Sequence, residues 1–185
     1  MPELILGGQR SGKSRCAEQR AAAWLATSGH EAVLLATALP GDDEMRKRIA
    51  QHRRDRAECV PGMRTDEVPR ELAQALYRHS APQRMVVVDC LTLWLTNLLM
   101  PLHGAALDAS AWAHRRQVLC DALQRAPGPV VLVSNEIGLG LAPMSAEARR
   151  FVDELGRLHQ AVAALCPRVD LMVAGIELPV KRGGV

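Results

Sequence analysis

Short runs of apolar residues alternate along the chain with longer stretches in which apolar and polar positions recur at helical spacing. The runs predict five β-strands, at Glu3–Leu6, Ala32–Ala36, Met85–Asp89, Val130–Val133 and Asp170–Ala174. Most of them lack the alternation of a half-exposed strand, which favours strands buried on both faces of a parallel sheet. The longer stretches predict helices at Gly12–Ala26, Asp43–Arg54, Arg70–Tyr77, Ser110–Arg125 and Ala146–Leu165.

This succession of strands and helices predicts the fold class. Strands that alternate with helices form a parallel sheet with helices on both of its faces. We therefore expect an α/β fold of three layers around a mostly parallel central sheet. Two segments, Cys59–Asp66 and Leu102–Leu107, are predicted to be loops. With 185 residues and no internal repeat, the chain is expected to form a single catalytic domain over residues 1–185.

Composition narrows the class of protein. Apolar residues make up 48% of the chain and aromatic residues 3%, so a core can form but must be mainly aliphatic. The net charge of +3 permits anionic ligands without requiring a nucleic acid. The five cysteines are widely spaced, which argues against a zinc site or a disulfide framework. We expect a cytoplasmic enzyme, because no signal peptide is seen and the longest apolar run, Leu91–Pro101, is too short to span a membrane.

The strongest local motif lies near the start of the chain. Residues 7–14 fit the pattern GxxxxGK[ST], with an apolar strand before them and a helical pattern after them. Such a loop curls backbone N–H groups around phosphate oxygens at the start of a helix. The motif makes the expected fold a RecA-like P-loop NTPase. The candidate nucleotide-binding residues of this loop are Gly7, Gly8, Gln9, Arg10, Ser11, Gly12, Lys13 and Ser14.

Two side chains of the loop have distinct expected roles. Lys13 should reach the β- and γ-phosphates of a nucleotide, and Ser14 should offer its hydroxyl to Mg²⁺. A second metal ligand is expected at Asp89, which ends an apolar strand as a Walker-B carboxylate does. The alternative for Asp89 is a strand-end residue that caps the next element. The P-loop favours the metal role.

A basic stretch, residues 45–56, contains one histidine among six arginines and lysines. Asp42 and Asp43 precede it as candidate N-caps, which indicates a helix. Four of its residues then share one face, whose apolar members would press on the sheet: Met45, Ile49, His52 and Arg56.

His52 can be interpreted in more than one way. A neutral imidazole is a competent nucleophile toward phosphorus, and neighbouring guanidinium groups favour its neutral form and can bind the phosphates under attack. Spacing alone favours an ordinary histidine on a solvated basic helix, because any helix of this composition places Arg beside His. A nucleic-acid surface is a weaker alternative, since no aromatic residue is interleaved for base stacking.

Taken together, these motifs resemble one family over nearly the whole chain, the bifunctional adenosylcobinamide kinase / adenosylcobinamide-phosphate guanylyltransferases of cobalamin biosynthesis. The similarity rests on the stretches LGGQRSGKS, DDEMRKRIAQHRRDR, VVVDCLTLWLTNLL and VLVSNEIGLGLAP. The second and third of these are more specific than the P-loop. One stretch departs from the pattern, since AECVPGMRTDE has Met63 where the family commonly has Trp.

The resemblance implies an activity and a set of site residues. Such an enzyme phosphorylates adenosylcobinamide with GTP or ATP, and then transfers GMP from GTP to the phosphorylated product. The transfer passes through a covalent histidyl-GMP, at the position that is His52 here. Beyond the P-loop, the family's nucleotide contacts would fall on Ala36, Thr37, Ala38, Arg53, Arg54, Asp55, Arg56, Glu67 and Asp89.

The resemblance also implies partners. The family tends to form trimers with the histidine-bearing helix near a subunit boundary, so we expect a homo-oligomer that binds neither nucleic acid nor membrane. The alternative function is a single-function P-loop small-molecule kinase in which His52 has no role. Glu136 could position the corrinoid, assist proton transfer or shape its own turn. His159 has no matching motif and is treated as ordinary.

Overall fold

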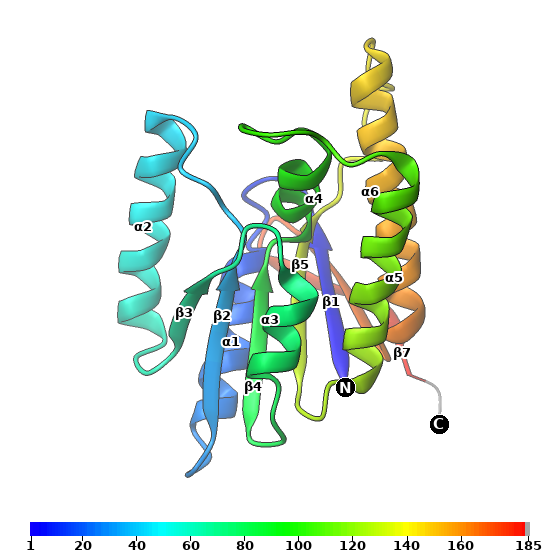
Figure 1. Ribbon diagram of the computed structural model, residues 1–185. Coiled ribbons are helices and arrows are strands. Elements are labelled where there is room, and N and C mark those ends of the chain that lie inside the picture. Colours follow the sequence, from blue (N-terminus) through cyan, green and yellow to red (C-terminus); the bar gives the residue numbers. More distant parts are fainter. Residues whose placement is uncertain (184–185) are drawn as a thin grey trace.

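The central feature of the computed structural model, which describes residues 1–183, is a seven-stranded sheet (Figure 1). The strands are β1 (Pro2–Gly7), β2 (Glu31–Ala36), β3 (Arg64–Glu67), β4 (Arg84–Asp89), β5 (Val130–Asn135), β6 (Arg168–Val173) and β7 (Ile176–Arg182). They lie in the order β3-β2-β4-β5-β1-β6-β7, and all pairs are parallel except β6 with β7. The predicted α/β fold with a mostly parallel sheet is confirmed.

The two edge strands are absent from the sequence prediction. β3 reads Arg-Thr-Asp-Glu, has no buried residue and falls partly in the segment predicted to be a loop. β7 contains Pro179 and two cations, and its only pairing is with β6. An edge strand is solvated along one side, so it needs no apolar run and tolerates proline. The predicted loop at Leu102–Leu107 is confirmed.

Six helices cover both faces of this sheet (Figure 1). They are α1 (Lys13–Leu25), α2 (Asp43–Cys59), α3 (Leu72–His79), α4 (Leu91–Leu99), α5 (Ala109–Arg125) and α6 (Ala146–Leu165). One cluster of buried side chains joins the sheet to α1, and a larger one joins the opposite face to α3, α4, α5 and α6. The three layers are therefore confirmed. Among residues 1–183, no helix combines the length and the apolar character that a membrane crossing requires.

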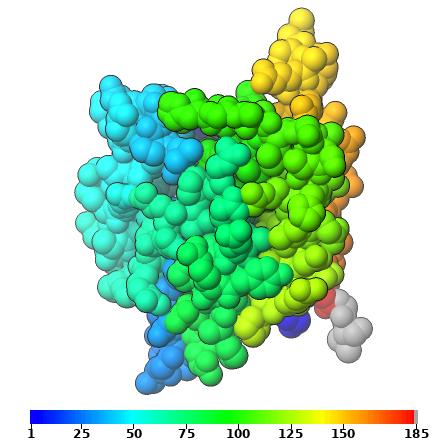
Figure 2. Space-filling model, in the orientation of Figure 1, coloured from blue at the N-terminus to red at the C-terminus, as the bar shows by residue number. Residues whose placement is uncertain are grey.

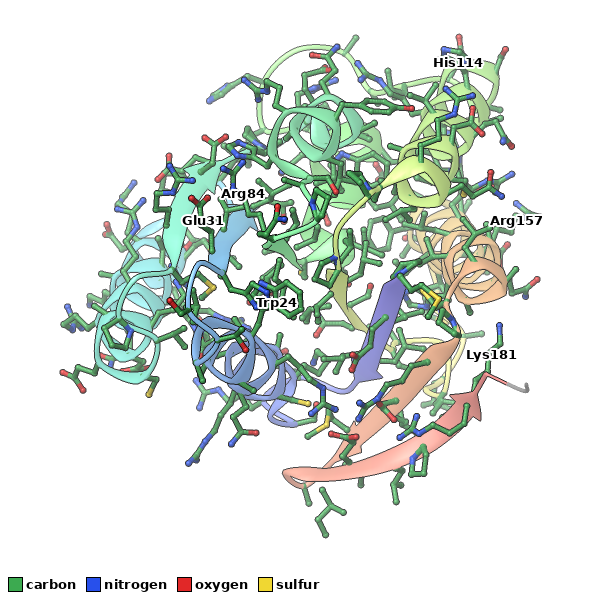
Figure 3. The ribbon with its side chains drawn as sticks, turned by 90° about the horizontal axis from the view of Figure 1, so that it is seen from below. Trp24, Glu31, Arg84, His114, Arg157 and Lys181 are labelled. Carbon is green, nitrogen blue, oxygen red and sulfur yellow. The ribbon has the colours of Figure 1, made fainter. Side chains whose placement is uncertain are left out.

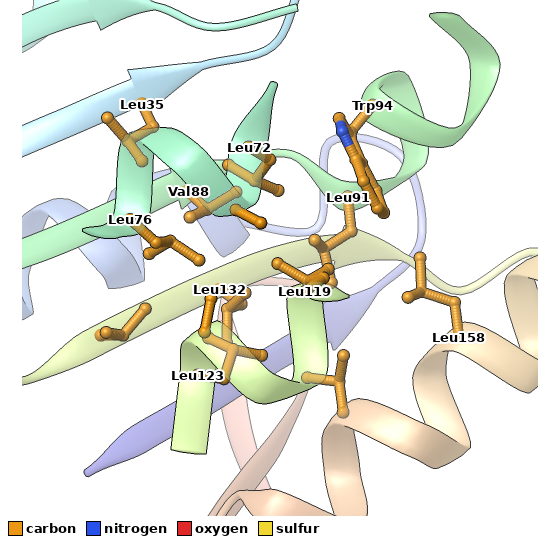
Figure 4. Packing of buried hydrophobic residues seen from close by; sticks show 14 of the residues in the cluster. Leu35, Leu72, Leu76, Val88, Leu91, Trp94, Leu119, Leu123, Leu132 and Leu158 are labelled. Carbon is orange, nitrogen blue, oxygen red and sulfur yellow. The ribbon is translucent and has the colours of Figure 1, made fainter. Parts of the chain in front are cut away.

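The larger cluster explains why α4 is hard to find in the sequence. Leucines from α3, α5 and α6 meet Leu91 and Trp94 over the sheet (Figure 4). Seven of the nine residues of α4 are buried, so the helix is apolar around most of its circumference and shows no amphipathic period. The Trp94 indole packs at 5.5 Å from that of Trp112 and donates its N–H to the Arg70 carbonyl at 2.8 Å.

α2 stands beside the β3 edge of the sheet and next to α1 (Figures 1 and 2). The Asp42 carboxylate accepts from the Met45 N–H at 2.7 Å, which confirms the predicted N-cap. Of the seventeen residues of α2, Arg56 is buried and Met45, Ile49 and His52 are half-buried, so the four residues predicted to share one face are the least exposed of the helix. The prediction that the apolar side of this helix presses on the sheet is wrong, because two large apolar side chains among so many cations offer too little surface to cover a sheet.

The two ends of the parallel strands differ in chemistry. At the amino end, the Arg84 guanidinium pairs with the Glu31 carboxylate at 2.7 Å, and the two side chains lie side by side (Figure 3). At the carboxyl end, β1, β2, β4 and β5 stop at residues 7, 36, 89 and 135. Ligands of open α/β sheets bind at this end. Most of the candidate site residues lie there.

Candidate active site

The loop between β1 and α1 has the conformation of a phosphate cradle. A side chain at Gly7 would bring its Cβ within 2.5 Å of the Met172 carbonyl oxygen and 2.6 Å of Ser11 Oγ, so only glycine fits. Gly12 adopts φ 101°, which favours glycine just before the helix begins. The Gly175 N–H donates to the Ser11 carbonyl at 2.9 Å and braces the loop from the β6–β7 turn. The backbone is thus fixed close to the start of α1.

Lys13 is the charged centre of this loop, although only 7% of its surface is exposed. Its Nζ donates to the Gly8 carbonyl at 2.5 Å and lies 3.5 Å from Ser11 Oγ. Burial lowers the pKa of the Lys13 ammonium, and the nearby positive charge of Arg48 lowers it further, whereas the charge of Asp89 opposes the shift. A bound polyphosphate would offset this cost of burial, which suits the predicted role of Lys13.

Ser14 and Asp89 meet at the carboxyl end of the sheet. The Ser14 hydroxyl, in the first turn of α1, donates to Asp89 Oδ2 at 2.8 Å. Mg²⁺ is commonly held by one or two protein oxygen ligands together with substrate phosphates and water. A hydroxyl and a carboxylate beside the phosphate loop are donors of that kind, so the residues present fit the predicted ion.

Thr37 joins the ends of β2 and β4. It is fully buried, and its hydroxyl donates to the Cys90 carbonyl at 2.7 Å and accepts from the Cys90 N–H at 2.8 Å. Its own N–H donates to the Asp89 carbonyl at 3.1 Å. The side chain of Thr37 therefore positions the Asp89 segment. The neighbouring candidates Ala36 and Ala38 are half-buried and carry polar atoms only on the backbone.

Asn97 secures the same corner from α4. Its Nδ2 donates to the Thr37 carbonyl at 2.7 Å and to the Pro69 carbonyl at 3.0 Å. We expect Asn97→Ala to lower the free energy of unfolding by about 1–3 kcal/mol, because buried carbonyls lose their donor. Thr96→Ala is the matched control, since its hydroxyl bonds only within α4. Urea denaturation compares the two variants, and equal losses would contradict this role for Asn97.

One side of α2 carries basic residues whose charges act on the phosphate loop and on Asp89. Arg48, His52 and Arg56 are spaced four residues apart, so they follow one another along one side of the helix. At one end of this face, the charge of Arg48 acts on Lys13. At the other end, burial lowers the pKa of the Arg56 guanidinium while the charge of Asp89 opposes that shift. The half-buried imidazole of His52 lies one helical turn from each of these arginines on the same side of α2.

A pocket of about 420 Å³ opens where α2 ends and β3 begins. Val60, Met63 and Thr65 contribute to its walls, and Arg53 and Glu67 form an ion pair at the pocket. A concave site that combines apolar walls with a few polar groups is typical of small-molecule binding. Arg56 also lines the pocket, so three of the predicted nucleotide contacts gather here.

Other predicted nucleotide-binding residues do not line this pocket. Arg54 and Asp55 are exposed on α2 and hydrogen-bond the amide of Gln51, at 2.7 and 2.5 Å. In the phosphate loop, Gly8, Gln9 and Arg10 are also exposed. A nucleotide contact at these five positions stays a prediction. No sequence motif marks Glu18 on α1, where burial raises the pKa of the carboxyl against the charge of Arg56.

The geometry can be set against known protein families. The sequence model of the family described as cobinamide kinase / cobinamide phosphate guanyltransferase matches residues 3–180. The chain belongs to this family. The match runs from β1 into β7, so it includes the phosphate loop, α2 and the Asp89 strand. The resemblance inferred from the motifs is confirmed.

Individual members of the cobinamide kinase / guanyltransferase family match over nearly their full length. The bifunctional adenosylcobalamin biosynthesis protein CobP of Pseudomonas aeruginosa is 48% identical over 181 residues, which cover 98% of both chains. The bifunctional adenosylcobalamin biosynthesis proteins CobU of Escherichia coli K12 and Salmonella typhimurium LT2 are each 37% identical over 187 residues. These alignments cover 96% of the present chain and 98% of each relative.

His159 of this cobinamide kinase / guanyltransferase, expected to be an ordinary histidine, is a buried polar group. His159 is 7% exposed and hydrogen-bonds Ser134 Oγ at 2.7 Å. It shares the buried stripe of α6 with Leu155 and Val162. The helical period of that stripe is the sequence signal that marks His159 as an inward-facing polar group.

Proposed function

We propose that this enzyme carries out both reactions of its family at one phosphate loop, and that His52 carries GMP between them. In the first reaction the γ-phosphate of GTP or ATP passes to a hydroxyl of adenosylcobinamide. In the second, GMP from GTP is added to the phosphate so formed. Family membership supports the two reactions. The observation that carries the role of His52 is its place on α2 between Arg48, whose charge acts on Lys13, and Arg56, on which the charge of Asp89 acts.

In the kinase reaction the protein binds and orients the triphosphate. The loop N–H groups and the Lys13 ammonium bind its β- and γ-phosphates. Ser14 and Asp89 would hold Mg²⁺, which would supply positive charge against the developing negative charge. Thr37 keeps Asp89 in place through its bonds to the next residue.

In the guanylyl reaction His52 acts as the nucleophile. A lone pair of the neutral imidazole attacks the α-phosphorus of GTP, and the bond to the β-phosphate oxygen breaks with its electron pair on pyrophosphate. Arg48 and Arg56 stabilise the negative charge on the phosphates. A phosphate oxygen of the corrinoid then attacks the same phosphorus, and the electron pair of the nitrogen–phosphorus bond returns to His52.

We assign the pocket beside Arg56 to the guanine base. Guanine presents N–H donors on the edge where adenine presents an acceptor, and a carboxylate is an acceptor. Glu67 therefore supplies the chemistry that selects guanine, while Val60 and Met63 contact the faces of the ring.

Labelled GTP tests the proposal. The protein is incubated with Mg²⁺ and GTP that carries ³²P on either the α- or the γ-phosphate, and is then denatured in alkali. We expect α-label to remain on the chain and to be released by acid, as a phosphoramidate is, while γ-label is absent. A protein that phosphorylates adenosylcobinamide but retains no α-label would contradict the histidyl-GMP and leave a single-function P-loop kinase.

We also propose that residues 1–185 act as a single catalytic domain of a cytoplasmic homotrimer. The lone buried residue of α2 supports the assembly, because the other sixteen leave most of the helix open to a neighbouring subunit. The five cysteines are free thiols, which suits a reducing compartment. Sedimentation equilibrium measures the assembly state, and a monomer at micromolar concentration would contradict it.

A further inference from the structure

Glu136 lies directly against the phosphate loop. β5 is inserted between β1, which leads into that loop, and β4, which ends at Asp89. Gly7 is paired with Asn135 across the β1–β5 ladder, and the Glu136 N–H donates to the Gly7 carbonyl at 2.9 Å. The residue that follows β5 is therefore held at the start of the phosphate loop.

A buried chain of hydrogen-bonding side chains ends at the Glu136 carboxylate. The Asn135 N–H donates to Thr92 Oγ1 at 2.8 Å, and Thr92 Oγ1 lies 3.0 Å from Ser134 Oγ. Ser134 Oγ lies 2.7 Å from His159 Nε2, and on the other side of the ring Nδ1 faces Glu136 Oε2 at 3.6 Å. Thr92, Ser134 and His159 are each at most 8% exposed, so the chain is shielded from water.

One arrangement of protons along this chain leaves the imidazole neutral. In it the Thr92 hydroxyl, which accepts from the Asn135 N–H, donates to Ser134, and the Ser134 hydroxyl donates to His159 Nε2. The imidazole is then neutral with its proton on Nδ1, directed at the carboxylate of Glu136. Burial is the main influence on the pKa of His159 and lowers it, which agrees with a neutral ring. If the hydrogen bonds ran in the opposite direction, a neutral His159 would carry its proton on Nε2, and its unprotonated Nδ1 would face the Glu136 carboxylate.

We propose that Glu136 is the general base that accepts the hydroxyl proton of adenosylcobinamide in the kinase reaction, and that His159 is a positioning residue that aims it. The proposal rests on phosphoryl transfer at the phosphate loop. The substrate oxygen forms a bond to the γ-phosphorus as its proton moves to a carboxylate oxygen of Glu136. The bond from the γ-phosphorus to the bridging oxygen breaks, and its electron pair leaves with GDP or ADP. The protonated carboxyl then returns its proton to solvent.

If Glu136 had only a structural role, that role would be to shape the turn after β5. Glu136 Oε1 accepts from the Gly138 N–H at 2.6 Å, and this bond shapes the turn after β5. A glutamine amide oxygen accepts the same bond. The turn uses only Oε1, so it does not account for the buried His159 beside Oε2. The side chain of Glu136 is 22% exposed and so is open to a substrate, while its Oε2 lies 3.6 Å from Nδ1 of the buried His159 ring.

Glu136→Gln separates the two roles. We expect kcat of the kinase reaction to fall about 10²- to 10⁴-fold, the usual contribution of a general base, with little change in KM for adenosylcobinamide. GMP transfer to adenosylcobinamide phosphate, which has no hydroxyl to deprotonate at the reacting phosphate, should persist and shows that the variant is folded. An unchanged kinase rate would overturn the proposal, as would an equal loss of both activities. The kinase readout is independent of His52, so a missing histidyl-GMP would leave this test intact.

A pair of His159 variants tests the positioning role. In asparagine the amide nitrogen can occupy the place of Nδ1 and donate to Glu136, whereas in glutamine the amide reaches the place of Nε2 and serves only Ser134. We expect His159→Asn to retain more kinase activity than His159→Gln, with the difference in kcat and not in KM. Equal kinase rates, or GMP transfer that falls in parallel, would show that His159 serves packing alone.

Discussion

Replacement of His52 by alanine is expected to abolish GMP transfer while phosphorylation of adenosylcobinamide continues. The imidazole is the only group of the guanylyl reaction proposed to bond covalently to phosphorus, and enzymes that lose their nucleophile commonly lose ~10³-fold or more in kcat. The kinase reaction transfers the γ-phosphate directly to the substrate and has no step at His52. Separate assays for adenosylcobinamide phosphate and adenosylcobinamide-GDP measure the two rates in one preparation.

The folded state should tolerate this change. His52 is half-buried on a helix that is otherwise almost wholly exposed, and substitutions at such positions usually alter stability by no more than about 0.5 kcal/mol. The matched control is His114→Ala, an exposed histidine on α5, which should affect neither rate (Figure 3). Equal loss of kinase and transfer activity in His52→Ala would show that the histidine supports the site as a whole and does not carry GMP.

Replacement of Lys13 by methionine is expected to lower kcat of both reactions about 10²- to 10³-fold. Each reaction develops negative charge on a triphosphate held by the same loop, and the loss of one preorganised donor commonly has an effect of that size. Methionine has a similar length and suits a position that is 7% exposed. Because it also removes the cost of burying a cation, the melting temperature should not fall.

The control for Lys13→Met is Lys47→Met, which removes an exposed cation from α2 without altering the loop. Both rates should be retained there. If Lys13→Met impaired only the kinase reaction, GTP would have to bind elsewhere during GMP transfer. The assignment of both reactions to one phosphate loop would then be wrong.

The sequence predicts the parts of this fold whose causes are local. Each of the five central strands is an apolar run, and the structure places β1, β2, β4, β5 and β6 at those runs to within two residues at either end. The sequence does not predict α4 or the edge strands β3 and β7, and the reasons are opposite. α4 is buried around most of its surface and so has no polar face, whereas neither edge strand has a buried residue or a continuous apolar run: β3 is polar, and in β7 apolar residues alternate with Glu177, Pro179 and Lys181.

The candidate site divides in the same way. Lys13, Ser14 and Asp89 belong to short motifs in a fixed context of strand and helix, so their meeting can be predicted from the chain. The group formed by Thr92, Ser134 and His159 comes from α4, β5 and α6, and no local pattern joins them. Only tertiary packing brings these hydroxyls and this imidazole behind Glu136. The position of α2 beside the sheet is likewise decided by packing.

The antiparallel turn into β7 brings the last strand back to the end of the sheet where β1 starts. Arg182 is paired with Arg168, and Arg168 with Glu3, whereas the phosphate loop begins at the far end of β1. A linker attached before Met1 would therefore leave from the side of the molecule opposite the reacting groups. Tethering through the first residue, to a bead or to a fused enzyme that supplies the corrinoid, leaves the catalytic face turned outward and unobstructed.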